Sequence, residues 1–174
     1  MTIHRENPFV GGERDPVRQF RGRMIAPVSI WAAAARERRA GWTMSSFLVA
    51  DGTPAVVVGL LDEDSDLAAM LAASPRFTVN LLSWRHRSLA EAFAGLSPAP
   101  GGVFRLGSWT ETDWGPTLDG APGWLGARVV DDLGEHGGWA FLVKAEIEHL
   151  EIGVETAEPL LAHYRGRYLP VSTP

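Results

Sequence analysis

The sequence contains no cysteine, and this absence removes several kinds of chemistry at once. Disulfide frameworks, thiolate nucleophiles and metal sites with cysteine ligands are all excluded. The histidines and acidic residues show no spacing typical of a metal site either. Catalysis by this chain therefore depends on other side chains or on a bound cofactor.

Long apolar runs are missing as well. No stretch approaches the roughly 18 apolar residues that cross a membrane as a helix. Residues 1–23 lack the apolar middle of a signal peptide. From these two absences we expect a cytoplasmic protein with no membrane partner.

Lysine is nearly absent, because Lys144 is the only lysine among 16 basic residues. The charges are also unevenly distributed. Residues 1–39 contain eight arginines against four acidic residues, whereas residues 40–174 contain eight basic residues against seventeen acidic ones. An acidic body argues against a broad nucleic-acid surface, so we expect no nucleic-acid partner.

What the chain does contain fits one globular domain. It has 174 residues, of which 45% are hydrophobic and 21% are charged, and this length can bury a full core. The composition along the chain predicts three parts. These are a polar N-terminal arm or short helix (1–22), one domain (23–170) and a short tail (171–174).

Short apolar runs between turn signals dominate the chain. Residues 55–61 are β-branched and apolar, as in a buried strand, and Asp64 and Ser65 can cap a helix over Asp66–Ala73. The pattern predicts a mainly β fold, a small barrel with one or two short helices. The other expected elements are strands at 24–35, 42–50, 77–82, 124–130 and 139–151, a helix at 88–94, a long loop at 95–122 and an extended segment at 160–169.

Residues 41–47, Gly-Trp-Thr-Met-Ser-Ser-Phe, place three hydroxyl side chains between two apolar runs. Small hydroxyl residues let a ligand lie close to backbone N–H groups, and they supply further hydrogen-bond donors. Such a cluster suits a phosphate or the edge of a flavin ring. A polar strand end or turn is the alternative interpretation.

The hydroxyl cluster is the first of several motifs that occur in a fixed order over residues 24–169. Together they resemble the flavin-reductase-like family, whose members are FMN-binding split-barrel proteins. The motifs are Thr43-Met-Ser-Ser-Phe47, Val58-Gly-Leu-Leu-Asp62, Ser65, Ser74-Pro-Arg-Phe77, Val79-Asn80, Leu89-Ala-Glu-Ala-Phe-Ala94 and His163-Tyr-Arg-Gly-Arg-Tyr168.

The resemblance implies a Greek-key split β-barrel that forms a homodimer, with a flavin near the subunit interface. It also implies an enzyme that uses NADH or NADPH to reduce flavin, often for an oxygenase partner. FMN is the expected cofactor, with FAD or a deazaflavin as alternatives. A flavin carries the hydride chemistry itself, so the protein supplies binding and orientation and needs no acid–base pair.

The resemblance also assigns residues to the flavin site. The first motif matches the family's flavin-contacting segment, and a second loop matches the segment near the ribityl phosphate. A helix that begins at Ser65 favours an anion there. The implied contacts are Thr43, Met44, Ser45 and Ser46 in the first segment and Leu61, Asp62 and Ser65 in the second.

The second loop departs from the family pattern in its charge. Relatives often carry basic residues there, whereas this chain has four carboxylates around Ser65. Carboxylates repel a phosphate dianion unless they point away, so a bound phosphate needs cations from elsewhere. The candidates are Arg39 with its neighbours Arg36 and Arg38, and Arg23; the four carboxylates belong to Asp62, Glu63, Asp64 and Asp66.

A second departure concerns the nicotinamide side. Flavin reductases commonly have a Gly-Asp-His triplet before the penultimate strand, and the match here ends in Trp139. Its indole can stack on a nicotinamide or shield the flavin, or it can fill the edge of the barrel. His163 and Tyr164 match a family position near the nicotinamide or flavin, with packing of a terminal strand as the alternative.

Three hypotheses follow from these observations. The first is an NAD(P)H-dependent flavin reductase that supplies reduced flavin to an oxygenase. The second is a non-reducing protein of the same fold that holds FMN, a deazaflavin or haem. The third is a structural dimer without a cofactor, which the hydroxyl cluster and the motif from His163 to Tyr168 disfavour.

Overall fold

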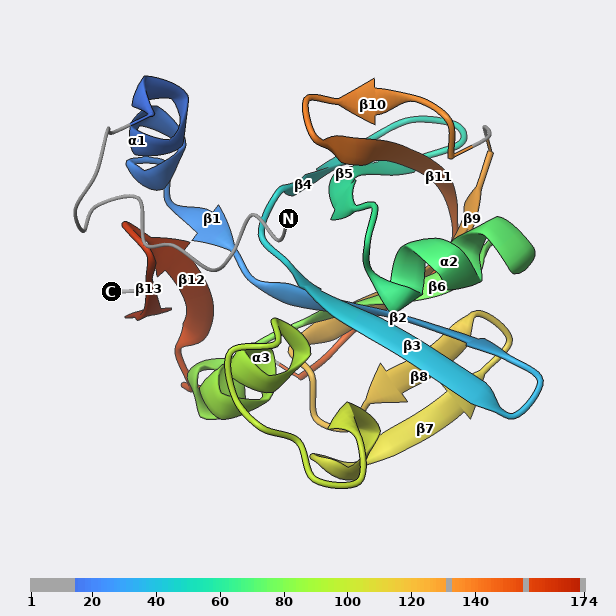
Figure 1. Ribbon diagram of the computed structural model, residues 1–174. Helices are drawn as coiled ribbons and strands as arrows, with labels where there is room; N and C mark the ends of the chain where they lie inside the picture. The colour runs from blue at the N-terminus through green and yellow to red at the C-terminus, as the bar shows by residue number, and fades with distance from the viewer. Residues whose placement is uncertain (1–14, 131–132, 155–156, 173–174) are drawn as a thin grey trace.

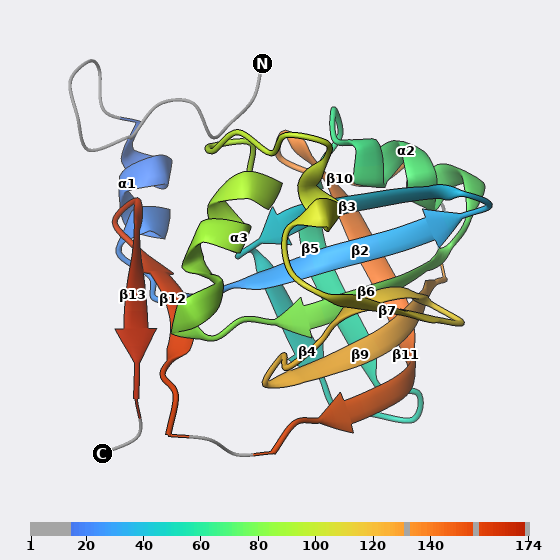
Figure 2. The same ribbon diagram turned by 90° about the horizontal axis from the view of Figure 1, so that it is seen from below.

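The computed structural model describes residues 15–130, 133–154 and 157–172. Strands dominate these residues, and the helices are short and lie outside the sheets (Figures 1 and 2). The helices are α1 (Pro16–Gly22), α2 (Asp66–Ala73) and α3 (Arg87–Phe93), with 3₁₀ turns η1 (Trp84–His86) and η2 (Val103–Arg105). The strands are β1 (Ala26–Pro27), β2 (Ser29–Ala35), β3 (Arg38–Met44), β4 (Phe47–Ala50), β5 (Val56–Asp62), β6 (Arg76–Leu81), β7 (Trp109–Thr112), β8 (Gly115–Leu118), β9 (Gly123–Val129), β10 (His136–Gly137), β11 (Ala140–Ile152), β12 (Leu160–Tyr164) and β13 (Arg167–Val171).

The main sheet is antiparallel and curls into a barrel whose two edges meet at one point. Its strand order is β3-β2-β6-β9-β11-β5-β4, with β10 paired to β11. The two edge strands, β3 and β4, are consecutive in the chain and are joined only by Ser45 and Ser46. A sheet whose opposite edges are linked by two residues has to bend around until those edges meet. The expectation of a mainly β barrel is therefore confirmed.

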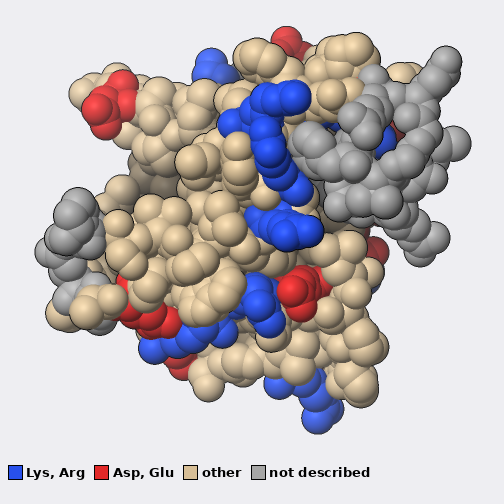
Figure 3. Space-filling model, turned by 90° about the vertical axis from the view of Figure 1, so that its left-hand side faces the viewer, with Lys and Arg blue, Asp and Glu red and all other residues tan. Residues whose placement is uncertain are grey.

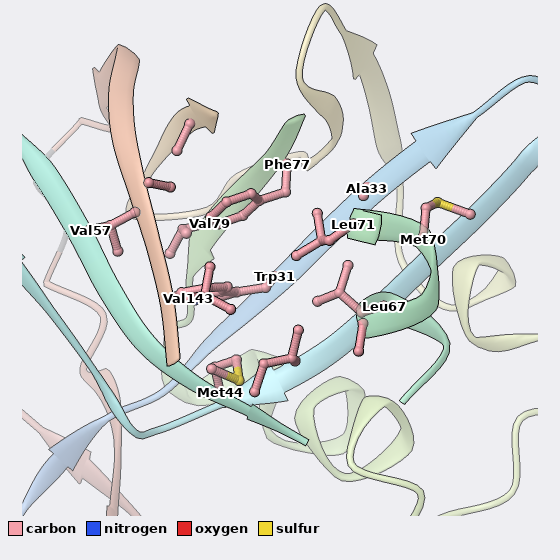
Figure 4. Close-up of a cluster of buried hydrophobic side chains, with 14 of the residues drawn as sticks. Trp31, Ala33, Met44, Val57, Leu67, Met70, Leu71, Phe77, Val79 and Val143 are labelled. Carbon is pink, nitrogen blue, oxygen red and sulfur yellow. The ribbon is translucent and has the colours of Figure 1, made fainter. Parts of the chain in front are cut away.

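The barrel interior is filled by one apolar cluster (Figure 4). Trp31 on β2 is fully buried and stacks on Phe77 of β6, with ring centroids 4.8 Å apart. Leu67 and Leu71 of α2 reach into the same cluster and cover one end of it. The Ser65 hydroxyl accepts the Ala68 N–H at 3.1 Å, which confirms the predicted cap and the bounds of this helix.

A second, smaller sheet stands beside the barrel and consists of β1, β12 and β13. Strands β12 and β13 form a hairpin whose two turn residues, Arg165 and Gly166, both have positive φ, as a tight hairpin turn requires. Gly22 at the end of α1 is tied to this turn, because its carbonyl accepts the Arg165 N–H at 2.8 Å. Helix α1 itself has no buried residue.

The segment 95–122, which was expected to be a long loop, contains more regular secondary structure than expected. It contains η2 and the β7–β8 hairpin. Buried polar side chains of β6 hold this hairpin: Thr78 donates to the Pro116 carbonyl at 2.6 Å, and Asn80 accepts the Leu118 N–H at 2.8 Å. The expectation was wrong because these partners lie more than thirty residues away in the sequence.

One smaller expectation also needs correction. The strand expected over 42–50 is broken at Ser45 and Ser46, where the barrel edges meet. Helices α2 and α3 agree with the one or two short helices expected of the domain. Within residues 1–22, expected to be an arm or a short helix, a short helix forms, because Asp15 accepts the Val17 N–H at 2.9 Å and Pro16 starts α1. None of the described helices is long and apolar enough to span a membrane.

Candidate functional site

A cavity of about 700 Å³ lies where the two edges of the barrel meet. One wall comes from the β3–β4 turn and from β5, and the opposite wall comes from α1 and β1. The β12–β13 hairpin and the end of α3 close the remaining side. The lining residues are Arg18, Arg21, Gly22, Met24, Ile25, Ala26, Pro27, Val28, Thr43, Ser45, Ser46, Phe47, Leu48, Val58, Gly59, Leu60, Ala94, Leu96, His163, Gly166 and Tyr168.

The hydroxyl cluster supplies the polar part of the first wall. Leu60 N–H donates to the Ser46 carbonyl at 2.9 Å, which fixes the β3–β4 turn against β5. The Thr43 hydroxyl donates to the Ala90 carbonyl at 2.8 Å, so it can offer only its oxygen lone pairs to a ligand. Ser45 and Ser46 are half-buried, and their hydroxyls have no hydrogen-bond partner among the described residues. They are the hydroxyl donors that this wall offers to a ligand.

Alternate residues of β5 make the wall flat and apolar. Val58 and Leu60 face the cavity, whereas Val57 and Leu61 point into the barrel core. Gly59 lies on the core side, where a Cβ atom would stand 2.6 Å from the Trp31 ring. The absence of a side chain at this position therefore lets the buried indole lie directly beneath the cavity wall.

The cations of the cavity come from α1, and the aromatic groups come from the β12–β13 hairpin. Arg18 and Arg21 line the cavity, and no Asp or Glu occurs among its described lining residues. His163 and Tyr168 contact each other edge to face, with centroids 5.7 Å apart. Burial, with a smaller contribution from Glu91, raises the pKa of Tyr168 to about 12, so its hydroxyl keeps its proton at neutral pH.

The second loop lies outside this cavity. Leu61 is fully buried in the core, and the Ser65 hydroxyl is occupied by the α2 cap and by the Asp62 carbonyl, to which it donates at 2.6 Å. Asp62 is only 7% exposed; its Oδ1 accepts the Asp64 N–H at 3.0 Å, and its buried Oδ2 has no partner among the described residues. An unpaired carboxylate oxygen suits a hydroxyl donor and repels a phosphate.

Two further residues of the predicted flavin site also point away from the cavity. Met44 is 3% exposed and packs in the barrel core. Arg39 forms an ion pair with Glu111 and lies over the Phe104 ring. It sits at the far end of β3, about 20 Å from Ser45 along the strand. The β2–β3 hairpin tip and α1 lie at opposite ends of the molecule (Figures 1 and 2).

The residues predicted for the nicotinamide side are separated in the structure. Trp139 occupies the turn between β10 and β11 and is 85% exposed. No residue of this hairpin is among the described lining residues of the cavity, although Gly137 packs against Leu60, whose side chain would lie 2.5 Å from a Cβ atom at Gly137. Tyr164 lies under the Arg165 guanidinium outside the cavity lining, so of the predicted group only His163 lines it.

Tyr168, Arg18 and Arg21 line the cavity but were not predicted as site residues. Tyr168 was part of the last motif but received no role, and residues 1–22 were expected to be an arm or short helix without a role in the flavin or nicotinamide site. The spacing of Arg18 and Arg21 places both on one helix face, which is the signal that would have identified them. The described residues contain no group of three or more His, Asp or Glu that could hold a metal ion.

A family model described as a flavin reductase like domain matches residues 21–172, most of the chain. The chain belongs to this family. It is 32% identical over 148 residues to the reductase component of 4-nitrophenol 4-monooxygenase/4-nitrocatechol 2-monooxygenase from Rhodococcus opacus, covering 84% of this chain and 75% of that relative. The fold of this flavin reductase-like chain also has solved counterparts.

Nitrilotriacetate monooxygenase component B from Mycobacterium thermoresistibile superposes with a TM-score of 0.79 at 26% identity, covering 91% of this chain and 90% of that one. The NADH:FAD oxidoreductase SgcE6 of Streptomyces globisporus C-1027, solved with NAD and FAD fragments, superposes with a TM-score of 0.78 at 22% identity. That match covers 94% of this chain and 96% of the other, and it shows that the two share a fold.

Proposed function

We propose that this protein uses NADH or NADPH to reduce a flavin and supplies the reduced flavin to an oxygenase partner. Membership in the flavin reductase-like family supports the reaction. The Rhodococcus relative, named as the reductase component of a monooxygenase, supports the partner. The observation that carries the proposal is the cavity where the two edges of the barrel meet, because the hydroxyl motif lies there beside a flat apolar wall.

The cavity fits a flavin in size and chemistry. Its volume of about 700 Å³ lies within the range of roughly 300–1,000 Å³ that small-molecule sites occupy. The strand wall at Val58 and Leu60 is apolar, as a planar ring system requires. Ser45 and Ser46 offer hydroxyl donors at one edge, where the polar pyrimidine part of the ring needs them.

The protein's own residues bind and orient in this reaction. A bound flavin would supply the hydride chemistry, because its ring can take two electrons from a reduced nicotinamide. Ser45 and Ser46 would hold the edge of the ring, and Leu60 would support its face. His163 and Tyr168 line the remaining side of the cavity, where the protonated Tyr168 hydroxyl would donate to a nicotinamide carboxamide.

We also propose that two copies of the chain form a homodimer around this site. Val17 and Phe20 of α1 are 75% and 71% exposed, and the helix has only seven residues. A helix this short is marginal in water unless an apolar face packs against something. Three further apolar side chains near the cavity are exposed, namely Leu48, Val49 and Leu96. Leu48 and Leu96 belong to the cavity lining, and Val49 follows Leu48 on β4. A second protomer would cover all three.

The test is NADH or NADPH oxidation measured with and without added FMN or FAD. We expect oxidation that depends on flavin, and bleaching of the flavin's visible absorbance when oxygen is excluded. Ser46→Leu, which fills the cavity, should remove this activity. Ser88→Leu is the matched control, since Ser88 is exposed on α3 outside the cavity.

Flavin that binds but is never reduced by either nucleotide would support the non-reducing alternative instead. Full activity in Ser46→Leu would mean that the flavin binds outside this cavity. A protein that neither binds nor reduces any flavin would overturn the proposed function.

A further inference from the structure

The charge around the cavity differs from the charge that the second loop led us to expect. Its described lining contains Arg18 and Arg21 and no carboxylate. The acidic residues around Ser65 lie outside it. A phosphate in this cavity would therefore meet a basic wall, although the sequence surrounding Ser65 is acidic.

Helix α1 presents two different faces because of its residue spacing. Arg18 and Arg21 are three residues apart and line the cavity together. Val17 and Phe20 are also three apart, each one position earlier, so they lie on an adjacent face that is exposed. The helix thus presents a pair of guanidinium groups to the cavity and an apolar pair to its surroundings.

Among the residues that the structure describes, no group holds the two arginines strongly. Arg18 lies 4.0 Å from the Asp15 carboxylate, and both side chains are more than a third exposed. Exposed ion pairs of this kind contribute little, so Arg18 can turn toward an anion. No described carboxylate lies within ion-pair distance of Arg21. Figure 3, which views the molecule from the side of α1 and β13, shows basic side chains in a row down the middle of this face.

The arginines stand across the cavity from the hydroxyl cluster. Ser45 and Ser46 belong to the β3–β4 turn, whereas α1 and the β12–β13 hairpin form the other side (Figures 1 and 2). A flavin nucleotide has the same polarity, with its ring at one end and its phosphate at the end of the ribityl chain. A ring held by the serines directs the phosphate toward α1.

We infer that Arg18 and Arg21 bind the ribityl phosphate of the flavin nucleotide. This inference rests on the proposed function and names the cations of that same site. Guanidinium groups match phosphate oxygens with paired, charge-assisted hydrogen bonds. The protein therefore distinguishes FMN and FAD from riboflavin, which has the same ring and no phosphate.

The test compares the affinities of riboflavin, FMN and FAD in Arg18→Ala, Arg21→Ala and the double variant. We expect each single change to weaken FMN and FAD about tenfold, with riboflavin unchanged. The salt dependence of FMN binding should also flatten in the double variant, because the charge pairs that salt screens are gone.

Arg38→Ala is the matched control. Arg38 is an exposed arginine at the start of β3, outside the cavity lining and part of the hairpin that the sequence offered as an alternative. It should leave all three affinities unchanged. Because α1 has no buried residue, the substitutions on it should not alter the thermal midpoint of the protein.

Three outcomes would overturn the inference. Equal weakening of riboflavin and FMN would mean that the arginines act on the helix or on the assembly, which sedimentation of the variants measures. A raised KM for NADH with unchanged flavin affinity would assign them to the phosphates of the nicotinamide nucleotide. If only Arg38→Ala weakens FMN binding, the phosphate binds at the β2–β3 hairpin instead. In each case the wild-type protein still reduces flavin, so the proposed function stands.

Discussion

Ser46 and Ser65 were both expected to contact the flavin, and the structure gives them separate tasks. Ser46 lines the cavity, whereas the Ser65 hydroxyl caps α2. We therefore predict that alanine substitutions at the two positions have opposite consequences. Ser65→Ala should lower stability and leave flavin affinity unchanged, and Ser46→Ala should do the reverse.

The size of each effect follows from the contacts. Ser65→Ala leaves the Ala68 N–H unpaired, while the Asp62 carbonyl keeps the Ser65 N–H at 3.2 Å. Loss of a cap costs about 1 kcal/mol, and the buried N–H raises this to about 1.5 kcal/mol. For a domain of this size that corresponds to a fall of about 3 to 6 °C in the thermal midpoint. Ser46→Ala removes one hydrogen bond to the ligand, about 1 kcal/mol or about fivefold in affinity.

Both quantities are measured on the same two proteins. Thermal unfolding without ligand gives the stability, and flavin fluorescence titration gives the dissociation constant. If Ser65→Ala weakens FMN with no change in midpoint, then the second loop holds the flavin and the cavity has been assigned to the wrong ligand. If Ser46→Ala lowers the thermal midpoint and Ser65→Ala does not, the separate tasks assigned to the two serines are also wrong.

Three further predictions concern assembly and pH. Phe20→Asp should convert a dimer into monomers, as measured by sedimentation velocity. Leu150→Asp is the control, because Leu150 is an exposed leucine on β11, and it should leave the dimer intact. The opposite result would place the interface on β11. Burial raises the pKa of Tyr168 to about 12, so the unfolded chain loses the phenol proton at a lower pH than the folded protein does. The free energy of unfolding should therefore fall by about 3 kcal/mol as the pH rises from about 10 to about 12. Urea unfolding of Tyr168→Phe should not show this fall. Burial and then the neighbouring Arg85 lower the pKa of His86, so the unfolded chain takes up a proton first and stability should decline as pH falls below 6.5. His86→Gln, which can still accept the Ser83 N–H, should keep the cap and lose that decline, and an unchanged decline would remove His86 as its source.

Local patterns in the sequence predicted the elements whose signals are local. The β-branched run at β5, the cap and apolar face of α2 and the short helix near α3 were all found from neighbouring residues. The β7–β8 hairpin was missed because it is held by Thr78 and Asn80 of a distant strand. The break at Ser45 was missed because closure of the barrel, rather than a Gly or Pro, imposes it.

The candidate site shows the same limit. The motif at Thr43–Ser46 identified one wall of the cavity, because strand alternation and hydroxyl content are visible in sequence. The other sides of the cavity come from α1, β1 and the β12–β13 hairpin, which meet the first wall only in the folded chain. Whether Leu61 or Arg39 faces the ligand depends on how the sheet curls, and a single sequence does not carry that information.

The absence of any buried residue in α1 also has a dynamic consequence. A short helix with no fully buried side chain opens at a low free-energy cost, so we expect its amides to exchange with solvent rapidly in a separate protomer. A partner that covers Val17 and Phe20 would slow this exchange, and a phosphate bound at the proposed Arg18 and Arg21 site would slow it further. The two events are thermodynamically linked, since each orders the segment that the other needs. Flavin affinity should therefore rise with protein concentration, and hydrogen exchange at α1 should report both at once.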